Sequence, residues 1–400
     1  MSVSVQAQMN SAWRATLAGF CASLVGIGFA RFAYTPLLPA LVSAHWFAAS
    51  SAAYLGAANL AGYLAGALTA RPMARASSPR AAINAMMLLA SIALAACAWP
   101  LSFAWFFLWR FASGLAGGVL MVLAATTVLH HIPPSRRGLA SGVIFMGVGA
   151  GIAASGTVVP LLIRQGLAAT WLSLGALSLV LTAITWSSWP RNATESAFSA
   201  AEAAEAKTPS TALRALYVQY ALNAVGLVPH MLFLVDFVAR GLHQGMQAGS
   251  GYWVVFGLGA LIGPVLAGHL ADRIGFGRAL RVAFLVEALA VALPVLGQGA
   301  GVLMLSSIVV GAFTPGIVPL ALGRIHELLP RHPAQQRAAW SRATTSFAVL
   351  QAAAAYGMSY LFSRDGSYAL LFALGSLALL LALAVDVVRD RGQRHSEFSR

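Results

Sequence analysis

Charged side chains are scarce in this sequence: aspartate, glutamate, lysine and arginine together make up 9% of its 400 residues. A soluble globular chain carries about 25% charged residues. With 59% hydrophobic residues and a mean hydropathy of +0.77, the composition excludes an ordinary soluble protein and indicates a membrane protein. The net charge of +14 does not indicate nucleic-acid binding, because the basic residues lie between apolar stretches rather than on one face.

Cysteine is nearly absent, and the two cysteines, Cys21 and Cys97, both fall in apolar stretches. This excludes a disulfide framework and a cysteine-rich metal site. Walker motifs and Ser/His/Asp constellations are also missing, so we expect no ATP-driven transport, no enzyme, no cofactor and no metal. Arg14 precedes a stretch too long for the core of a cleavable signal peptide. Lys207 is the only lysine, and with the high alanine content this suggests a GC-rich bacterial genome.

What the sequence has in abundance is long apolar runs. A transmembrane helix needs about 20 mostly apolar residues, and 400 residues hold roughly a dozen such helices joined by short loops. We expect an all-α polytopic membrane protein with spans at about 15–41, 50–70, 82–100, 103–130, 138–163, 168–189, 214–240, 249–271, 279–298, 300–328, 338–363 and 366–388.

The arginines predict the orientation of these spans. Twenty basic residues fall in one set of loops and ends, whereas only Arg164, Arg240 and Arg364 fall in the other set. By the positive-inside rule both termini are cytoplasmic, which agrees with an even number of spans.

The sequence divides near its middle. Residues 191–213 are polar and predict a cytoplasmic linker between an N-terminal six-helix bundle (1–190) and a C-terminal one (214–400). The two parts repeat weakly: Leu-Ala-Gly at 64–66 matches Leu-Ala-Gly at 266–268. Weak internal repeats mark transporters that rock one half against the other around a central site.

A short loop between two apolar stretches reads Gly268-His269-Leu270-Ala271-Asp272-Arg273-Ile274-Gly275-Phe276-Gly277-Arg278. Glycine permits the tight turn that this loop demands, and Asp272 can accept hydrogen bonds from the amino end of a neighbouring helix. The segment resembles the loop signature of the major facilitator superfamily in its second-half copy. That resemblance implies a secondary transporter with twelve helices in two six-helix bundles, in which this loop latches the two halves. The expected latch residues are Gly268, Asp272, Arg273, Gly277 and Arg278, with Arg136 and Arg137 at the start of the fifth span.

The latch is expected to be one-sided, because Ala70 stands in the first-half loop where Asp272 stands in the second. The first span reads Gly26-Ile27-Gly28-Phe29-Ala30-Arg31-Phe32-Ala33-Tyr34-Thr35-Pro36-Leu37-Leu38-Pro39 and resembles the YbfB/YjiJ-type branch of the superfamily. Pro36 and Pro39 should bend this span. Tyr34 is three residues from Arg31, so both should face one way.

Arg31 and Arg110 are embedded in spans, where ionisable groups are costly and usually functional. Arg31 lies 17 residues after Arg14, or about 25 Å along a helix, and Arg110 should lie at a similar depth. In the superfamily the first and fourth spans line the central cavity, and the stretch that begins at Arg110 resembles the fourth-span signature. We expect at least one of the two arginines to line the cavity; the alternative is a structural arginine bound to backbone carbonyls at a helix break.

Three further embedded groups are candidates for carrying a coupling proton. An imidazole in water titrates near neutrality, so His230 could carry a proton, or it could merely hydrogen-bond between helices. Asp236 should lie near the outer surface, where it could pair with Arg31 or Arg110 or be solvated. Glu287 lies in the ninth span and could bind a proton or form a structural hydrogen bond. Uncharged candidates for substrate contacts are Gln219, Asn223, Thr126, Thr314, Thr344 and Gln351.

The fifth span is rich in glycine, from Gly142 to Gly156. It resembles the antiporter signature of drug exporters but lacks the Gly-Pro pair on which that signature centres. Close helix packing through small residues is the better interpretation.

The leading hypothesis is a proton-coupled secondary transporter that moves a small organic anion by alternating access. Arg31, Tyr34 and Arg110 would bind the anion, with Gln219, Asn223 and His230 as further contacts. The alternative is a proton-driven exporter of hydrophobic or cationic drugs, which would favour an acid in the cavity. We expect a monomer in the bacterial cytoplasmic (inner) membrane, in contact with lipid and with no nucleic-acid partner.

Overall fold

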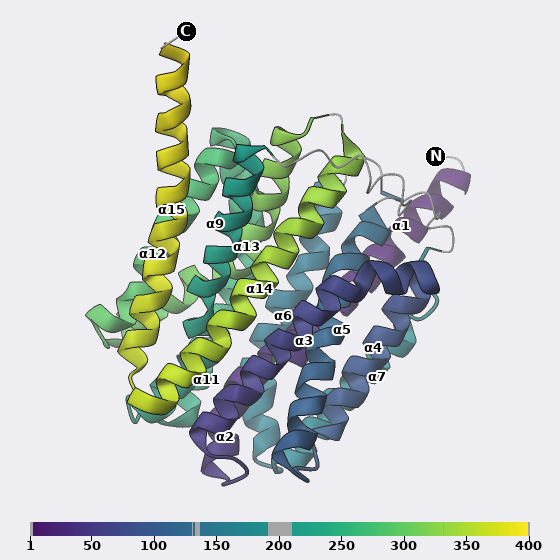
Figure 1. Ribbon diagram of the computed structural model, residues 1–400. Helices are drawn as coiled ribbons and strands as arrows, with labels where there is room; N and C mark the ends of the chain where they lie inside the picture. Colours follow the sequence, from purple (N-terminus) through teal and green to yellow (C-terminus); the bar gives the residue numbers. More distant parts are fainter. Residues whose placement is uncertain (1–2, 130, 133–136, 191–209, 331, 399–400) are drawn as a thin grey trace.

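The apolar runs of the sequence are all helical. The computed structural model describes residues 3–129, 131–132, 137–190, 210–330 and 332–398, and these form a bundle of long helices (Figure 1). The start of the first helix and the end of the last lie at the same end of the bundle (Figure 1), as an even number of spans requires. The architecture is an all-helical bundle of twelve spans.

The first six spans come before residue 190. The first span is broken into α1 (Val3–Ser23), η1 (Leu24–Phe32) and α2 (Tyr34–Ser43). The next five are single helices: α3 (Ala49–Ala76), α4 (Pro79–Ala96), α5 (Phe103–Leu129), α6 (Arg137–Ile163) and α7 (Leu167–Thr185).

The last six spans repeat this plan. The seventh span is broken into α9 (Thr211–Val228), η4 (Pro229–Phe233), α10 (Leu234–Asp236) and η5 (Phe237–Gly241). The others are α11 (Gly245–Ile274), α12 (Phe276–Leu296), α13 (Ala300–Leu328), α14 (Pro333–Asp365) and α15 (Tyr368–Phe398). Most ends of the spans fall within a few residues of the sequence prediction. The predicted linker 191–213 lies largely outside the described residues, and α9 already begins at Thr211.

Ten helices of the described chain are long and apolar enough to cross a membrane by their length and composition. The spans that fall short are α3 and α14, which pack against each other (Figure 1). A helix covered by another helix needs fewer apolar side chains than a helix that faces lipid, which accounts for their lower hydropathy.

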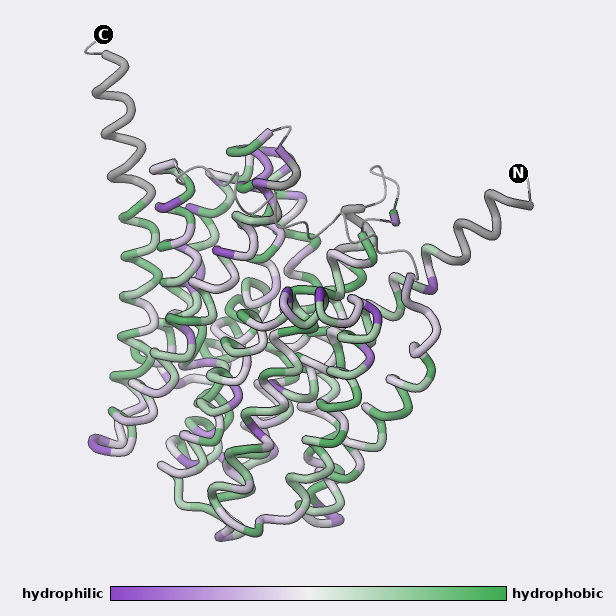
Figure 2. Tube along the Cα trace, turned by 45° about the vertical axis from the view of Figure 1, so that its right-hand side comes forward, coloured by the Kyte–Doolittle hydropathy of each residue, from purple (hydrophilic) through white to green (hydrophobic). Residues whose placement is uncertain are grey.

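The outer surface of the bundle is apolar. Hydrophobic residues run along the spans, and hydrophilic residues gather towards the ends of the bundle (Figure 2). Large aliphatic side chains such as Ile184 and Leu296 are 67% and 79% exposed. Such exposure of apolar surface is typical of lipid contact rather than of a soluble surface.

The first and seventh spans are both interrupted by π-helical turns, η1 and η4. Prolines lie at or just after these turns: Pro36 follows η1, and Pro229 begins η4. A proline cannot donate the helical hydrogen bond, so the backbone rearranges around it, and π-turns occur frequently at functional sites. In the first span, the regular helix is thus interrupted directly before the segment that holds Pro36 and Pro39.

Glycines pack two helix pairs at backbone contact, and the two pairs are equivalent. A Cβ atom on Gly114 of α5 would lie 1.8 Å from the carbonyl oxygen of Asn59 in α3, and a Cβ atom on Gly311 of α13 would lie 2.0 Å from that of Phe256 in α11. Gly114 and Gly311 are 197 residues apart. Gly66 and Gly263 have the same separation and likewise meet equivalent backbone carbonyls, those of Leu115 and Ala312. The sequence match of Gly66 with Gly268 was therefore wrong: nothing lies within 4 Å of a Cβ atom on Gly268.

Close packing also joins the first six spans to the last six. A Cβ atom on Gly149 of α6 would lie 2.7 Å from the backbone of Ala260 in α11, and one on Gly257 would lie 2.4 Å from that of Ala153. Trp253 donates a hydrogen bond from Nε1 to the Ser155 hydroxyl over 3.0 Å. The interpretation of the fifth-span glycines as packing residues is confirmed for Gly147, Gly149, Gly151 and Gly156, whereas nothing lies within 4 Å of a Cβ atom on Gly142.

Candidate functional site between the first and last six spans

Arg31 lies where the first and seventh spans meet. Its Nη2 donates to Sδ of Met231 in η4 over 3.6 Å, and the same sulfur accepts from Nε2 of Gln351 in α14 over 3.7 Å. The guanidinium carbon lies 5.2 Å from the ring centroid of Tyr63 in α3 and 5.3 Å from that of Phe32. We call Arg31, Tyr63, Met231 and Gln351 the Arg31 cluster; it draws on four spans.

Some polar atoms of the Arg31 cluster have no hydrogen-bond partner. Nε of Arg31 and Oε1 of Gln351 are buried without a hydrogen bond. Among the described residues no carboxylate pairs with Arg31, and the ion pairs there are formed by Arg240 and Arg324. A thioether is a weak acceptor, so the guanidinium is held by a weak acceptor and by aromatic rings. This arrangement can take a stronger acceptor, such as a carboxylate.

Arg110 has a different environment. It is 1% exposed, its Nη1 donates to the carbonyl oxygen of Ala30 over 2.8 Å, and its guanidinium carbon lies 4.3 Å from the Tyr34 ring centroid. Asn59 and Ser113 donate to the same carbonyl over 3.2 and 3.5 Å. Ala30 lies within the π-helical break, so Arg110 fits the alternative interpretation of a structural arginine on a backbone carbonyl. A substrate contact for Arg110 stays a prediction.

Tyr34 does not share a face with Arg31, so that expectation was wrong. Its ring lies under Arg110, and its hydroxyl donates to the carbonyl oxygen of Ala52 over 2.7 Å. The α-helical spacing rule fails here because η1 ends at Phe32, between the two residues, and a π-turn holds more residues than an α-turn.

Asp236 is fully buried. The sequence had suggested that it would be solvated or paired with Arg31 or Arg110, and both expectations were wrong. Nε and Nη2 of Arg240 donate to its two carboxylate oxygens, and the Tyr368 hydroxyl donates to Oδ2 over 2.6 Å. Arg240 follows four residues later, where a helical side chain can reach back. The network joins the seventh span to the start of α15.

Asn223 and Glu287 bind each other. Nδ2 of Asn223 in α9 donates to Oε2 of Glu287 in α12 over 2.8 Å, and both side chains are fully buried. The other oxygen of each, Oδ1 and Oε1, is buried without a hydrogen bond. Asn223 therefore contacts α12, and a direct substrate contact for it stays a prediction.

His230 also points into the last six spans. Its Nε2 lies 2.8 Å from the Ser306 hydroxyl, which donates to the carbonyl oxygen of Ala290 over 2.7 Å. Since that hydroxyl donates its only proton to Ala290, Nε2 must carry the proton that the pair shares. Nδ1 is buried without a partner, and Phe372 packs edge-on at 5.1 Å. This matches a neutral imidazole hydrogen-bonded between helices.

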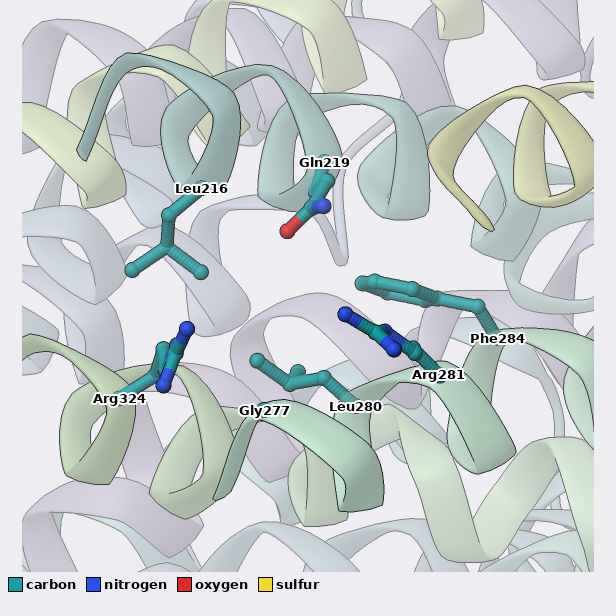
Figure 3. Close-up of a pocket in the computed structure, with 7 residues that line it drawn as sticks. All are labelled: Leu216, Gln219, Gly277, Leu280, Arg281, Phe284 and Arg324. Atoms are coloured by element: carbon teal, nitrogen blue, oxygen red, sulfur yellow. The ribbon is translucent and has the colours of Figure 1, made fainter. Parts of the chain in front are cut away.

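Gln219 lines a pocket formed by α9, α12 and α13, together with two arginines. Figure 3 shows Gln219 above Arg281 and Arg324, with its amide directed into the space between the helices. Its Nε2 is buried without a hydrogen bond. The other lining residues are Leu216, Gly277, Leu280 and Phe284.

The start of α12, next to Asp272 in the sequence, is contacted by another acid, Glu327. Asp272 is exposed, and no hydrogen bond or ion pair of it occurs among the described residues. Instead Glu327 of α13 accepts from the backbone N–H of Phe276, at the start of α12, over 3.1 Å, and from Nη1 of Arg324 over 2.7 Å. Gly275 makes the tight turn with φ 81°, as expected.

The remaining latch residues divide between described and undescribed parts. Arg273 and Arg278 are exposed. Arg136 and the side chain of Arg137 lie outside the described residues, so the latch itself stays a prediction.

Sequence reasoning missed several residues of this region. Asn59 and Tyr63 lie one helical turn apart in α3, a spacing of polar groups that could have been read from the sequence. Met231 gave no signal, because a methionine in an apolar span is usually a packing residue.

Solved structures share this fold. One is a crystal structure of a D-xylose–proton symporter, with a TM-score of 0.72, 16% identity, and coverage of 92% of this chain and 97% of that chain. Another is the xylose transporter XylE from E. coli in a partially occluded inward-open conformation, with a TM-score of 0.74, 13% identity, and coverage of 94% and 97%. At these identities the likeness shows the fold alone: the protein has the fold of a major facilitator transporter.

The family is narrower than the fold. The family model described as the uncharacterised MFS-type transporter YbfB matches residues 23–387, and the chain belongs to this family. It is therefore a multi-pass membrane transporter and not an enzyme. No curated protein matches the sequence significantly.

Proposed function

We propose that the protein moves a small organic anion across the membrane by alternating access, coupled to protons, and that Arg31 binds the anion. The observation that carries this proposal is the guanidinium of Arg31, which lies between the first and seventh spans without a carboxylate partner among the described residues. An embedded cation without a counter-ion is costly, and an incoming anion relieves that cost.

The geometry of the Arg31 cluster favours a carboxylate. A guanidinium offers two parallel N–H groups to a carboxylate, and such charge-assisted bonds are roughly twice as strong as neutral ones. The sulfur of Met231 takes only one of these donors, over 3.6 Å. Displacing the sulfur exchanges a weak bond for a strong one. Gln351 offers an amide to a further polar group of the substrate, and Tyr63 offers an aromatic face.

Arg110 acts in this proposal as a positioning residue. Its bond to the carbonyl oxygen of Ala30 holds the residue directly before Arg31. The guanidinium of Arg110 thereby stabilises the π-helical break, and the break sets the direction in which Arg31 leaves the backbone.

Three embedded groups remain candidates for the coupling proton: His230, Asp236 and Glu287. Asp236 is bound to Arg240, and His230 is hydrogen-bonded to Ser306. Glu287 has no cationic partner among the described residues, only Asn223. We therefore favour Glu287.

We further propose that the protein is a monomer in the bacterial cytoplasmic membrane, with two six-helix bundles, 1–190 and 214–400, and with both termini in the cytoplasm. The excess of basic residues on the side of the termini supports this orientation. Asp272 and its neighbours remain the proposed latch on that side.

The test is ligand-dependent stabilisation of the purified protein. A ligand at 100 times its Kd stabilises a fold by about 2.7 kcal/mol. The probes are lactate, benzoate and succinate, each against the parent, Arg31→Lys, Arg31→Gln and the control Arg364→Gln, which removes an exposed arginine. We expect at least one anion to raise the melting temperature of the parent and the control, to raise it less in Arg31→Lys, and to have no effect on Arg31→Gln. Equal shifts in all four proteins would refute the role of Arg31.

One observation favours a second candidate, an exporter of hydrophobic compounds. Aromatic rings pack against the seventh span at a tilt, with ring centroids of Tyr220 and Phe347 4.7 Å apart and Trp340 5.9 Å from Tyr220. Adding the hydrophobic cation tetraphenylphosphonium to the same screen distinguishes the two candidate functions. If this cation alone raises the melting temperature, and does so also in Arg31→Gln, the exporter is favoured.

A further inference from the structure

A carboxyl and a carboxamide lie side by side between α9 and α12. Nδ2 of Asn223 donates to Oε2 of Glu287 over 2.8 Å, and neither side chain is exposed. The second oxygen of each group, Oδ1 of Asn223 and Oε1 of Glu287, is buried and has no donor. Two acceptors without a donor in one hydrogen-bonded pair need an explanation, because buried polar atoms are almost always satisfied.

One proton supplies the missing donor. An ionised carboxylate can only accept, whereas a protonated carboxyl has one O–H donor. With that proton, Glu287 can donate to Oδ1 of Asn223 while it accepts from Nδ2, so the pair forms two hydrogen bonds. The argument survives reversal of the amide, since the amide oxygen would then face Oε2 and would again need a proton on the carboxyl.

The surroundings of Glu287 also favour the neutral acid. A buried ionised carboxylate requires a cation or several donors, and Asn223 is its one polar partner among the described residues. On the helices packed against α12, some charged groups lie at helix ends: Arg214 near the start of α9, and Asp272 and Arg273 at the end of α11. The others named here have partners of their own. Arg324 pairs with Glu327 on α13, Asp236 pairs with Arg240 beside α15, and His230 is bound to Ser306. On α12 itself, Arg281 lies near the start and lines the pocket of Figure 3.

We propose that Glu287 holds a proton in this conformation, in a neutral acid–amide pair with Asn223, and that this proton is the one coupled to the conformational change. Release gives a carboxylate and a proton to water on one side, and uptake of a proton from water on the other side restores the acid. The coupling part rests on the proposed function. The pair and the Arg31 cluster share the seventh span, on which Asn223 and Met231 lie eight residues apart.

The protonated pair is tested by infrared spectroscopy of the protein in liposomes. The carbonyl stretch of a protonated carboxyl is separate from the bands of carboxylates. We expect the parent to show it at neutral pH, Glu287→Gln to lack it, and the matched control Glu327→Gln to keep it. Glutamine has nearly the shape of the neutral acid and can make both hydrogen bonds, so this variant should fold. If it does not, Asn223→Ala should shift the band of the acid. Absence of the band in the parent, or a band unchanged in both variants, overturns the proposal.

The coupling is tested without a substrate. The rings of Tyr54, near the start of α3, and Tyr356, in the last third of α14, lie 6.3 Å apart, in the half of each span that is further from the side of the termini. Spin labels on Tyr54→Cys and Tyr356→Cys report the opening of this side of the bundle. We expect the label distance to lengthen as the pH rises in the parent background, and to stay short in Glu287→Gln. The same pH response in both backgrounds overturns the coupling. Failure of every anion in the stability screen would refute the proposed function and leave these two readouts unchanged.

Discussion

Removal of Arg240 should destabilise the protein far more than removal of its partner Asp236. The two differ in burial: the side chain of Asp236 is 0% exposed, and that of Arg240 is 29% exposed. In Arg240→Gln the carboxylate stays buried and keeps only the hydrogen bond from Tyr368. In Asp236→Asn the guanidinium loses its partner, but it borders a groove of about 460 Å³ lined also by Ser50 and Phe362, so water can solvate it.

The magnitudes follow from this asymmetry. Breaking a buried ion pair by removing one partner costs about 3–5 kcal/mol. Because Arg240 is partly exposed, we expect Arg240→Gln to cost about 3 kcal/mol, at the lower end of that range. Asp236→Asn loses a hydrogen bond without leaving a buried charge, at a cost of about 1 kcal/mol. The double variant leaves no buried charge, so it should cost less than the two single variants together, with a coupling energy of about 2 kcal/mol.

The measurement is the free energy of unfolding of the four proteins in mixed micelles, with Arg364→Gln as the control for loss of an arginine at the same end. Additive effects, or an effect of Arg240→Gln no larger than that of Arg364→Gln, would refute the reasoning. The same series bears on proton coupling. If Asp236 serves as the counter-ion of Arg240 and not as the proton carrier, Asp236→Asn should keep its pH response in the spin-label assay.

Three further predictions concern packing, the loop after α11 and topology. Gly114→Ala should cost about 1–3 kcal/mol of stability, because the new methyl group would lie 1.8 Å from the carbonyl oxygen of Asn59; Gly142→Ala, with open space around it, should not lower the melting temperature. Glu327→Ala should cost about 1 kcal/mol and Asp272→Ala less than about 0.5 kcal/mol; equal losses would contradict the assignment of the helix-end contact to Glu327. Reporter fusions at both ends of the chain and within the linker should all report the cytoplasm, and one external report would contradict the orientation.

The spans could be predicted from the sequence because their signal is one-dimensional. A run of apolar residues of membrane length needs no knowledge of its neighbours. Even the two spans with weaker hydropathy, α3 and α14, were predicted to within two residues at one end each, and to within six at the other. The turn at Gly275 was predictable for the same reason, since only a few residues separate two apolar runs.

The contacts of the embedded polar residues could not be predicted, because each depends on which face of a helix meets which neighbour. Asn223 and Glu287 are 64 residues apart and meet across two spans. The expectation that Tyr34 and Arg31 share one face failed because the π-helical turn ends between them and changes the angular spacing of the side chains. The pairing of Asp236 with Arg240 was accessible from the spacing of four residues, and it was missed because Arg240 was assigned to the loop rather than to the helix.

The internal repeat shows how packing corrects a sequence alignment. The match of residues 64–66 with 266–268 rests on three small residues, which recur by chance in a chain this rich in alanine and glycine. The backbone contacts instead align Gly62 with Gly259 and Gly114 with Gly311, since each glycine meets the carbonyl oxygen of the equivalent residue. In this register Arg75, rather than Ala70, stands at the position of Asp272, so the acid of the second loop has a basic residue as its counterpart in the first.

The packing also bears on where the molecule can move. Within each set of six spans, glycines hold α3 against α5 and α11 against α13 at backbone distance, so these pairs should move as units. Between the two sets, Gly149 and Gly257 also bring α6 and α11 to backbone distance, so the boundary is closely packed at this point. The Arg31 cluster spans this boundary through the bond from Arg31 to Met231. In the proposed mechanism, an anion that takes the place of the sulfur removes this one contact across the boundary, whereas the bond from Trp253 to Ser155 remains.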